Sequence, residues 1–297
     1  EIPGYFSFTH SVWRHLFVYK KIFIVAVVVF ALLNALLVGL ASQDMYMQAV
    51  DILKQTGSEI FSGGWGEMGK GLLLTATIVS GSFDGTSGDA QQIYGLLLFL
   101  MLWLCTIWLV RAQLAGHAPK FRDGLYNSAA PLVATLLVSL LFIVQLVPAA
   151  LGILLYQVAS ISLQGGMALI VFIIMSLLIV LSLYLATSTF IAMVVITLPG
   201  MYPWRALRIA GDLVVGRRVR ILLRLLWGCM AAALTWTIIV VPIVVVSSWL
   251  QQAVPATAMI PIVPGTLAVV TSITTVFLST YVYLLYRKVV DDDASPA

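Results

Sequence analysis

The sequence predicts an all-α, polytopic membrane protein with six transmembrane helices. They form three units, each with a short interfacial helix, or elbow, followed by two spans. Three observations support this fold class. The chain of 297 residues is 61% hydrophobic and only 9% charged, whereas soluble domains have about 45–50% apolar and about 25% charged residues. Six apolar runs are long enough to span a bilayer, and nearly all basic residues lie on one side of them. We therefore expect a single membrane domain over residues 1–297.

The six spans are read from the length of the apolar runs, since each span needs about 20 mainly apolar residues. The runs cover residues 21–41, 93–110, 129–158, 167–198, 219–250 and 265–286. The third and fifth contain Pro148 and Pro242, respectively. A proline removes one backbone donor and kinks a helix, and a membrane bundle tolerates it where neighbouring helices satisfy the freed carbonyl.

The basic residues indicate the orientation. Fourteen of the 16 lie on one side of the predicted spans: Arg14, Lys20, Lys21, Arg111, Lys120, Arg122, Arg205, Arg208, Arg217, Arg218, Arg220, Arg224, Arg287 and Lys288. The other side has only Lys54 and Lys70. Because cytoplasmic loops carry an excess of lysine and arginine, we expect both termini to be cytoplasmic, in an integral protein of the cell (inner) membrane. Segment 42–92 is then outside.

Six arginines and no lysine are concentrated in one stretch, residues 203–227. The simplest interpretation is that they hold the end of the fifth span at the cytoplasmic side. Within 199–218 the residue spacing also predicts a cytoplasmic interfacial helix with one polar and one apolar side. Gly216 is expected to supply the left-handed turn that ends it. Segments of similar build precede the first and third spans, which is why we predict three repeated units.

A second interpretation is that these arginines bind anionic lipid headgroups. The candidates are Arg205, Arg208, Arg217, Arg218, Arg220 and Arg224. Three of them, at 217, 220 and 224, have the spacing of one helical face. A guanidinium binds phosphate through a planar fork that an ammonium lacks. Arg224 lies about one turn inside the span, a depth from which its long side chain is able to snorkel to the interface.

The same stretch resembles the elbow of bacterial glycerophosphodiesterase membrane domains, and of related uncharacterised six-helix bacterial membrane proteins. The resemblance rests on Pro203, Ala206, Leu207, Ala210, Leu213, Val214, Gly216, Arg217 and Arg218. A serine that often stands near position 210 or 211 in that pattern is absent here. The catalytic phosphodiesterase barrel that accompanies some members is missing as well. The resemblance therefore implies an architecture and no phosphodiesterase activity.

The sequence gives no sign of an enzyme. The three histidines, His10, His15 and His117, are not spaced as metal ligands. No histidine or lysine lies within a span away from its ends to serve as the base of a nucleophile. We expect no catalytic residues, no metal, no cofactor and no nucleic-acid partner. Cys105 and Cys229 both fall in apolar runs and are interpreted as buried thiols.

Polar residues inside the spans form a second group of candidates. They are Asn34, Gln145, Thr271, Thr275 and Ser279. The amides are typical of hydrogen bonds between helices, and small hydroxyl residues four apart allow helices to approach closely. The alternative is that these groups line a cavity.

Segment 42–92 is the one sizeable part outside the predicted spans. Its first part has apolar residues on one side of a helix and predicts an extracytoplasmic amphipathic cap.

The leading functional hypothesis is a non-enzymatic membrane protein that binds or organises anionic lipid at the cytoplasmic face, or serves as a membrane subunit of a larger assembly. Its partners would be membrane lipids with anionic headgroups, and the protein partner of such an assembly would be a further copy of the chain or a membrane complex. The alternative is an uncoupled or partner-driven permease for a small or lipidic solute.

Overall fold

The computed structural model describes residues 4–38, 89–162, 166–253 and 262–294, and these residues form helices joined by short turns. No strand occurs among them. The helices are α1 (Tyr5–Val18), α2 (Lys20–Leu37), α5 (Asp89–Leu114), α6 (Phe121–Ser128), α7 (Leu132–Ser162), α8 (Gly166–Val195), α9 (Pro203–Val214), α10 (Arg218–Ala253) and α11 (Ile262–Ala294). The predicted all-α fold class is confirmed. Residues 39–88, most of the expected cap, lie outside the described part of the chain.

Six of these helices are long and apolar enough to cross a membrane. Their spanning parts are Lys20–Leu37, Gln91–Leu114, Leu132–Tyr156, Leu169–Val195, Arg218–Ser247 and Ile262–Asp291. They coincide with the six runs found in the sequence, so the chain is an integral, polytopic membrane protein. The second span begins a few residues earlier than expected, because the helix continues through the polar residues Asp89–Gln92.

The three remaining helices, α1, α6 and α9, each precede a pair of spans, as the three-unit pattern predicts. Each buries a narrow stripe of side chains. In α1 the stripe is Phe8, Val12 and Leu16, at spacing four. In α9 it is Ala206, Ala210 and Val214, again at spacing four. This spacing places one side of a helix against the protein and leaves the other side for the surroundings.

The chain divides into two compact units. Unit 1 comprises residues 1–23, 100–232 and 276–297, and unit 2 comprises residues 24–99 and 233–275. Unit 1 therefore contains α1, α6, α7, α8 and α9 with one end of each other helix. All 14 basic residues that the sequence places on one side belong to unit 1.

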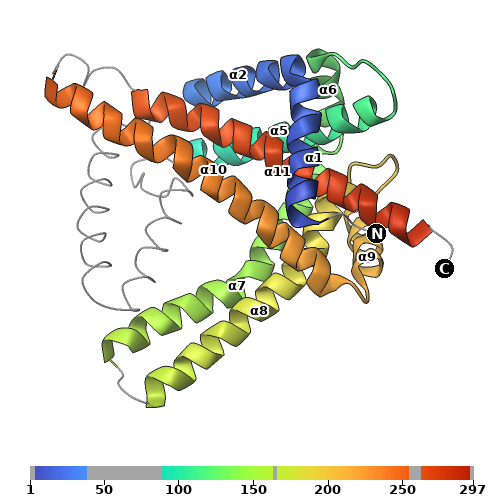
Figure 1. The fold of residues 1–297 in the computed structure, drawn as a ribbon. Helices are drawn as coiled ribbons and strands as arrows, with labels where there is room; N and C mark the ends of the chain where they lie inside the picture. Colours follow the sequence, from blue (N-terminus) through green and yellow to red (C-terminus); the bar gives the residue numbers. More distant parts are fainter. Residues whose placement is uncertain (1–3, 39–88, 163–165, 254–261, 295–297) are drawn as a thin grey trace. The chain divides into compact units, whose positions relative to one another are not determined.

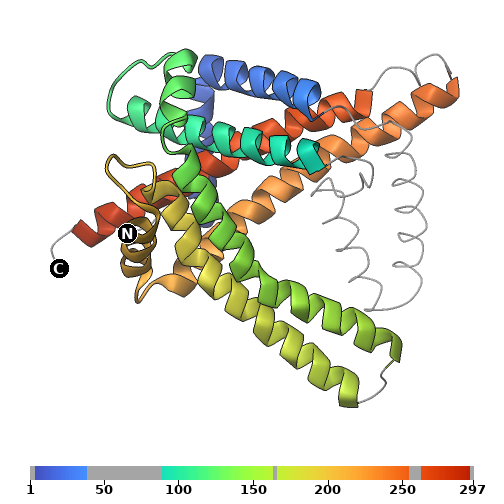
Figure 2. The same cartoon turned by 180° about the vertical axis from the view of Figure 1, so that it is seen from behind.

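Within unit 1, α7 and α8 form a long antiparallel hairpin, which both views show side by side (Figures 1 and 2). Gly152 of α7 permits the close approach, because a Cβ there would lie 3.3 Å from the Met175 backbone. Pro148 lies inside α7 without ending it. Just after it, the Ala149 N–H donates to Ser182 Oγ of α8 at 3.0 Å. A side chain of the neighbouring helix thus satisfies a backbone donor beside the proline, as a nonpolar solvent requires.

The parts of α10 and α11 in unit 1 pack closely at Gly228. A Cβ on this glycine would lie 2.7 Å from the Tyr281 ring. That ring is 1% exposed, makes an edge contact with Phe8 at 4.9 Å and donates its hydroxyl to the Arg224 carbonyl at 2.9 Å. In unit 2 the same two helices bury a small core of Trp236, Val240 and Val270.

We predict that Gly228→Val lowers the thermal stability of the protein in detergent, by about 1–3 kcal/mol, because the held Tyr281 ring leaves no room for a side chain. The matched control is Gly211→Ala in α9, where an added Cβ meets nothing within 4 Å. A thermal-unfolding assay followed by size-exclusion chromatography measures both variants. Equal melting temperatures for Gly228→Val and wild type would contradict this packing account.

Candidate lipid-headgroup site

The candidate site is the turn between α9 and α10. Gly216 has φ +75°, the left-handed conformation that the sequence predicts at this position. The Arg217 N–H donates to the Val214 carbonyl at 3.1 Å, and the Ile221 N–H donates to the Arg217 carbonyl at 3.0 Å. The turn is thus closed by hydrogen bonds at the last residue of α9 and the start of α10. Arg217, Arg218 and Arg220 follow directly after this turn.

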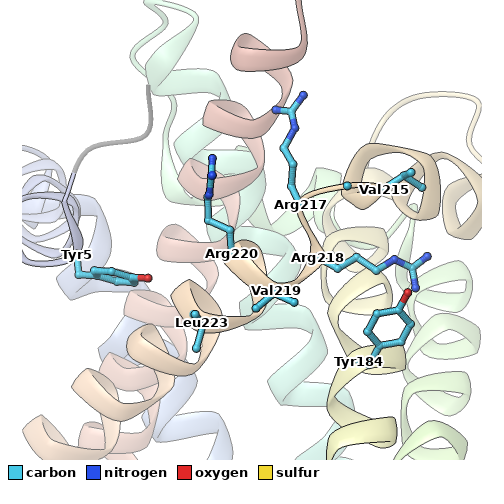
Figure 3. A pocket seen from close by; sticks show the side chains of 9 residues that line it. Tyr5, Tyr184, Val215, Arg217, Arg218, Val219, Arg220 and Leu223 are labelled. Carbon is cyan, nitrogen blue, oxygen red and sulfur yellow. The ribbon is translucent and has the colours of Figure 1, made fainter.

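These arginines line an open pocket of about 710 Å³. Its lining residues are Tyr5, Tyr184, Val215, Gly216, Arg217, Arg218, Val219, Arg220 and Leu223 (Figure 3). None of the lining residues is acidic. A pocket with three guanidinium groups and no carboxylate of its own is suited to an oxyanion, since arginine donors match phosphate and carboxylate oxygens in pairs. The same features could hold the phosphate of a cofactor or a headgroup.

The three side chains are not equivalent. In Figure 3, Arg217 and Arg220 extend in a similar direction, whereas Arg218 turns towards Tyr184. The Arg218 guanidinium carbon lies 4.7 Å from the centre of the Tyr184 ring. A cation–π contact of this kind contributes about 0.5–2 kcal/mol, depending on exposure. Arg220 is exposed, while Arg217 and Arg218 are half-buried.

Arg224 differs from what the sequence suggests. Its side chain is 6% exposed, and its guanidinium carbon lies 5.2 Å from the centre of the Tyr5 ring. An aromatic ring of α1 thus provides this guanidinium with a cation–π partner inside the protein. It does not line the pocket, although it shares a helical spacing with Arg217 and Arg220.

The remaining two candidates, Arg205 and Arg208, lie on the exposed side of α9 and also outside the pocket lining. The exposed Trp204, at 75%, accompanies them. The six arginines thus fall into three groups: three at the pocket, one buried beneath an aromatic ring and two on the outer side of α9.

The pocket also contains two residues that no pattern in the sequence singles out. Tyr5 and Tyr184 lie far from the arginines along the chain, in α1 and α8. Tyrosine is common near membrane interfaces, and no feature of the neighbouring sequence connects these two tyrosines with the arginines of the elbow. Only the tertiary structure shows that Tyr184 lies near Arg218 and Tyr5 near Arg224.

Helix α1 places Tyr5 and is held by two polar contacts in addition to its buried stripe. The Trp227 indole N–H donates to Thr9 Oγ1 at 3.1 Å. His15 Nε2 lies 3.0 Å from Gln113 Oε1 of α5. Because an amide oxygen only accepts, the neutral imidazole carries its proton on Nε2 in this contact. Burial lowers the pKa of His15 below its ordinary value of 6.5, and the hydrogen bond to Gln113 opposes this shift only in part.

The polar candidates inside the spans do not line this pocket. Thr189 Oγ1 of α8 donates to Gln145 Oε1 of α7 at 2.6 Å, so this amide joins two helices. Asn34 in α2 is half-buried. In α11, the Thr275 hydroxyl donates to the Thr271 carbonyl at 2.9 Å and the Ser279 hydroxyl to the Val276 carbonyl at 3.1 Å. Thr275 and Ser279 are buried, whereas Thr271 is exposed.

Comparison with known proteins provides no relative from which to transfer a function. No family model, no curated protein and no solved structure matches the chain. The resemblance of the elbow to glycerophosphodiesterase membrane domains therefore stays a prediction. Within the described ranges, no group of three or more histidine, cysteine, aspartate or glutamate residues is placed to hold a metal ion.

The lowered pKa of His15 predicts a pH-dependent stability. Folding favours the neutral imidazole, so the stabilisation is complete above pH 6.5 and is lost as the pH falls from 6.5 towards the lower pKa of the folded protein. We expect the melting temperature to fall between pH 7.5 and pH 5.5, and to fall less in His15→Asn. His10→Asn, at an exposed position of the same helix, is the control and should behave like wild type. An identical pH dependence in wild type and His15→Asn would contradict the prediction.

Proposed function

We propose that this chain is a non-enzymatic protein of the bacterial inner membrane that binds or organises anionic lipid through the pocket at the α9–α10 turn. The observation that supports this most directly is the set of three arginines, 217, 218 and 220, in one open pocket without an acidic lining residue. A role as a membrane subunit of a larger assembly is compatible with such lipid binding, since lipid can fill the contact between subunits.

The composition of the pocket also favours a lipid over a fully soluble anion. Three apolar side chains, Val215, Val219 and Leu223, line it beside the arginines and are 65%, 65% and 49% exposed. Val219 and Leu223 are four residues apart, so they lie on one side of α10. A phospholipid presents the same order of groups, with a charged headgroup above apolar chains. Each basic residue near an anionic leaflet contributes about 1 kcal/mol of attraction.

The proposal includes an orientation, in which the basic residues of unit 1 and both termini are cytoplasmic. We predict that a thiol introduced at Ala118 resists a membrane-impermeant maleimide in intact cells, whereas one introduced at Gln92 reacts. Both positions are exposed in the structure. The native Cys105 and Cys229 are first replaced by alanine. Labelling of Ala118→Cys in sealed cells would refute the orientation, and labelling after permeabilisation shows that the site is reactive.

The headgroup role is tested by replacing arginine with lysine, which keeps the positive charge and removes the planar guanidinium. We predict that Arg217→Lys/Arg220→Lys reduces co-purified anionic phospholipid by about one molecule per chain, because lysine cannot bind phosphate in a bidentate manner. Native mass spectrometry from mild detergent counts the retained lipids. Arg224 is not substituted, because its burial against Tyr5 would mix a packing defect with the effect on lipid.

The matched control is Arg205→Lys/Arg208→Lys, which makes the same chemical change at two exposed arginines outside the pocket. It should retain lipid like wild type, with orientation checked by the thiol assay. If the two double variants retain the same lipid as wild type, the arginines of the turn act only in setting topology, and the headgroup proposal fails.

A further inference from the structure

A second arginine-bearing pocket lies in unit 1, apart from the α9–α10 turn. It has a volume of about 370 Å³, and its walls come from α5, the α6–α7 junction and the segment that follows α8. Pockets for small organic ligands are about 300–1,000 Å³. The residues on which the argument depends are Trp108 and Arg111 of α5, Ala134 of α7, and Ile196 and Met201 after α8. None of these residues lines the pocket at the turn.

Arg111 is the charged group of this second pocket and is held in place. Its Nη1 donates to the Thr197 carbonyl, just beyond the end of α8, at 3.0 Å. A guanidinium has five N–H donors, so this bond uses one of them and anchors the group at that point. The side chain is half-buried, which means that its remaining donors interact in a partly desolvated environment, where charge-assisted hydrogen bonds are strong.

The rest of the lining defines the kind of ligand. None of the lining residues is acidic, so the pocket supplies no counter-charge to Arg111. Leu104, Ile196 and Met201 form the apolar part of the lining, and Asn127 and Ser128 add polar side chains. The half-buried Trp108 adds an indole with one N–H donor. One fixed cation against apolar walls suits a molecule with one negative group and an apolar part.

We propose that this pocket binds the phosphate group of an anionic amphiphile, with the phosphate oxygens on Arg111 and the apolar part beside Trp108, Ile196 and Met201. The chemistry fits two sources, a membrane phospholipid that enters with its headgroup first and a smaller soluble organic phosphate. The inference does not depend on the proposed function of the α9–α10 turn, because the two pockets share no residue.

Trp108 provides a local readout. The purified full-length protein in detergent is titrated with phosphatidylglycerol whose acyl chains carry bromine, which quenches tryptophan at short range. The same titration of Trp108→Phe records the quenching of the other tryptophans, and the difference between the two curves belongs to this pocket. We expect wild type to show the larger quenching with phosphatidylglycerol. We expect no difference with brominated phosphatidylcholine, because its phosphate carries a quaternary ammonium for which the pocket has no acidic partner.

Two further variants connect that signal with the pocket. Arg111→Gln should raise the lipid concentration for half-maximal difference quenching about tenfold, the effect of losing charge-assisted hydrogen bonds worth about 1.4 kcal/mol. Ala134→Phe should abolish the signal by filling the pocket while the bond between Arg111 and Thr197 stays intact. The matched control is Arg122→Gln, at an exposed arginine outside both pockets, which should leave the titration unchanged.

The outcomes distinguish the two ligand sources from each other and from failure of the proposal. Reversal of the difference quenching by glycerol 3-phosphate identifies a site open to soluble organic phosphates, and persistence in its presence identifies a membrane phospholipid. Equal quenching of wild type and Trp108→Phe, equal quenching by the two lipids, or an unchanged titration in both Arg111→Gln and Ala134→Phe would overturn the proposal. None of these results depends on the arginines of the α9–α10 turn.

Discussion

The cost of placing a charged side chain in hydrocarbon is the constraint on which the rest of this structure depends. A charge at the centre of a bilayer is so unfavourable that ionisable residues are rare in spans. Here 14 of the 16 basic residues belong to unit 1. Some buried hydroxyls are satisfied within their own helix, as in the bond from Thr280 to the Val276 carbonyl at 2.7 Å, and others by a neighbouring helix, as in the bond from Thr189 to Gln145 at 2.6 Å. The basic residues of unit 1 include the arginines that follow one another at the α9–α10 turn, where three of them line the pocket.

Aromatic rings contact two of the arginines near this turn. Tyr184 lies against Arg218 and Tyr5 against Arg224, at 4.7 and 5.2 Å. A guanidinium is planar and weakly hydrated, so it packs on a ring at less cost than an ammonium would. Arg218 and Arg224 each lie against a ring of the fold in this way. Arg217 and Arg220 extend in a similar direction at the pocket (Figure 3). This division gives a physical reason for a stretch with six arginines and no lysine, beyond the count of charges that sets topology.

Much of the fold follows from the sequence, because the bilayer imposes a length and a composition on each span. The six spans, the three short helices before them and the left-handed Gly216 are all predictable from local patterns. The site is less predictable. Helical spacing groups Arg224 with Arg217 and Arg220, yet Arg224 is buried because Tyr5, more than 200 residues away in the chain, covers it. Spacing reports which residues share a side of one helix and does not report what another helix places against that side.

Helix α5 connects the two candidate pockets through residues only two positions apart. Gln113 contacts His15 and so holds α1, which carries Tyr5 to the pocket at the turn. Arg111 supplies the charge of the second pocket and contacts the segment after α8. Both contacts lie within unit 1, and both fix a backbone segment by a side chain of the same helix. The end of α5 that carries Arg111 therefore supports both pockets. The Gln113 amide holds α1 at the pocket of the turn, and the Arg111 guanidinium lines the second pocket, where it faces the proposed ligand.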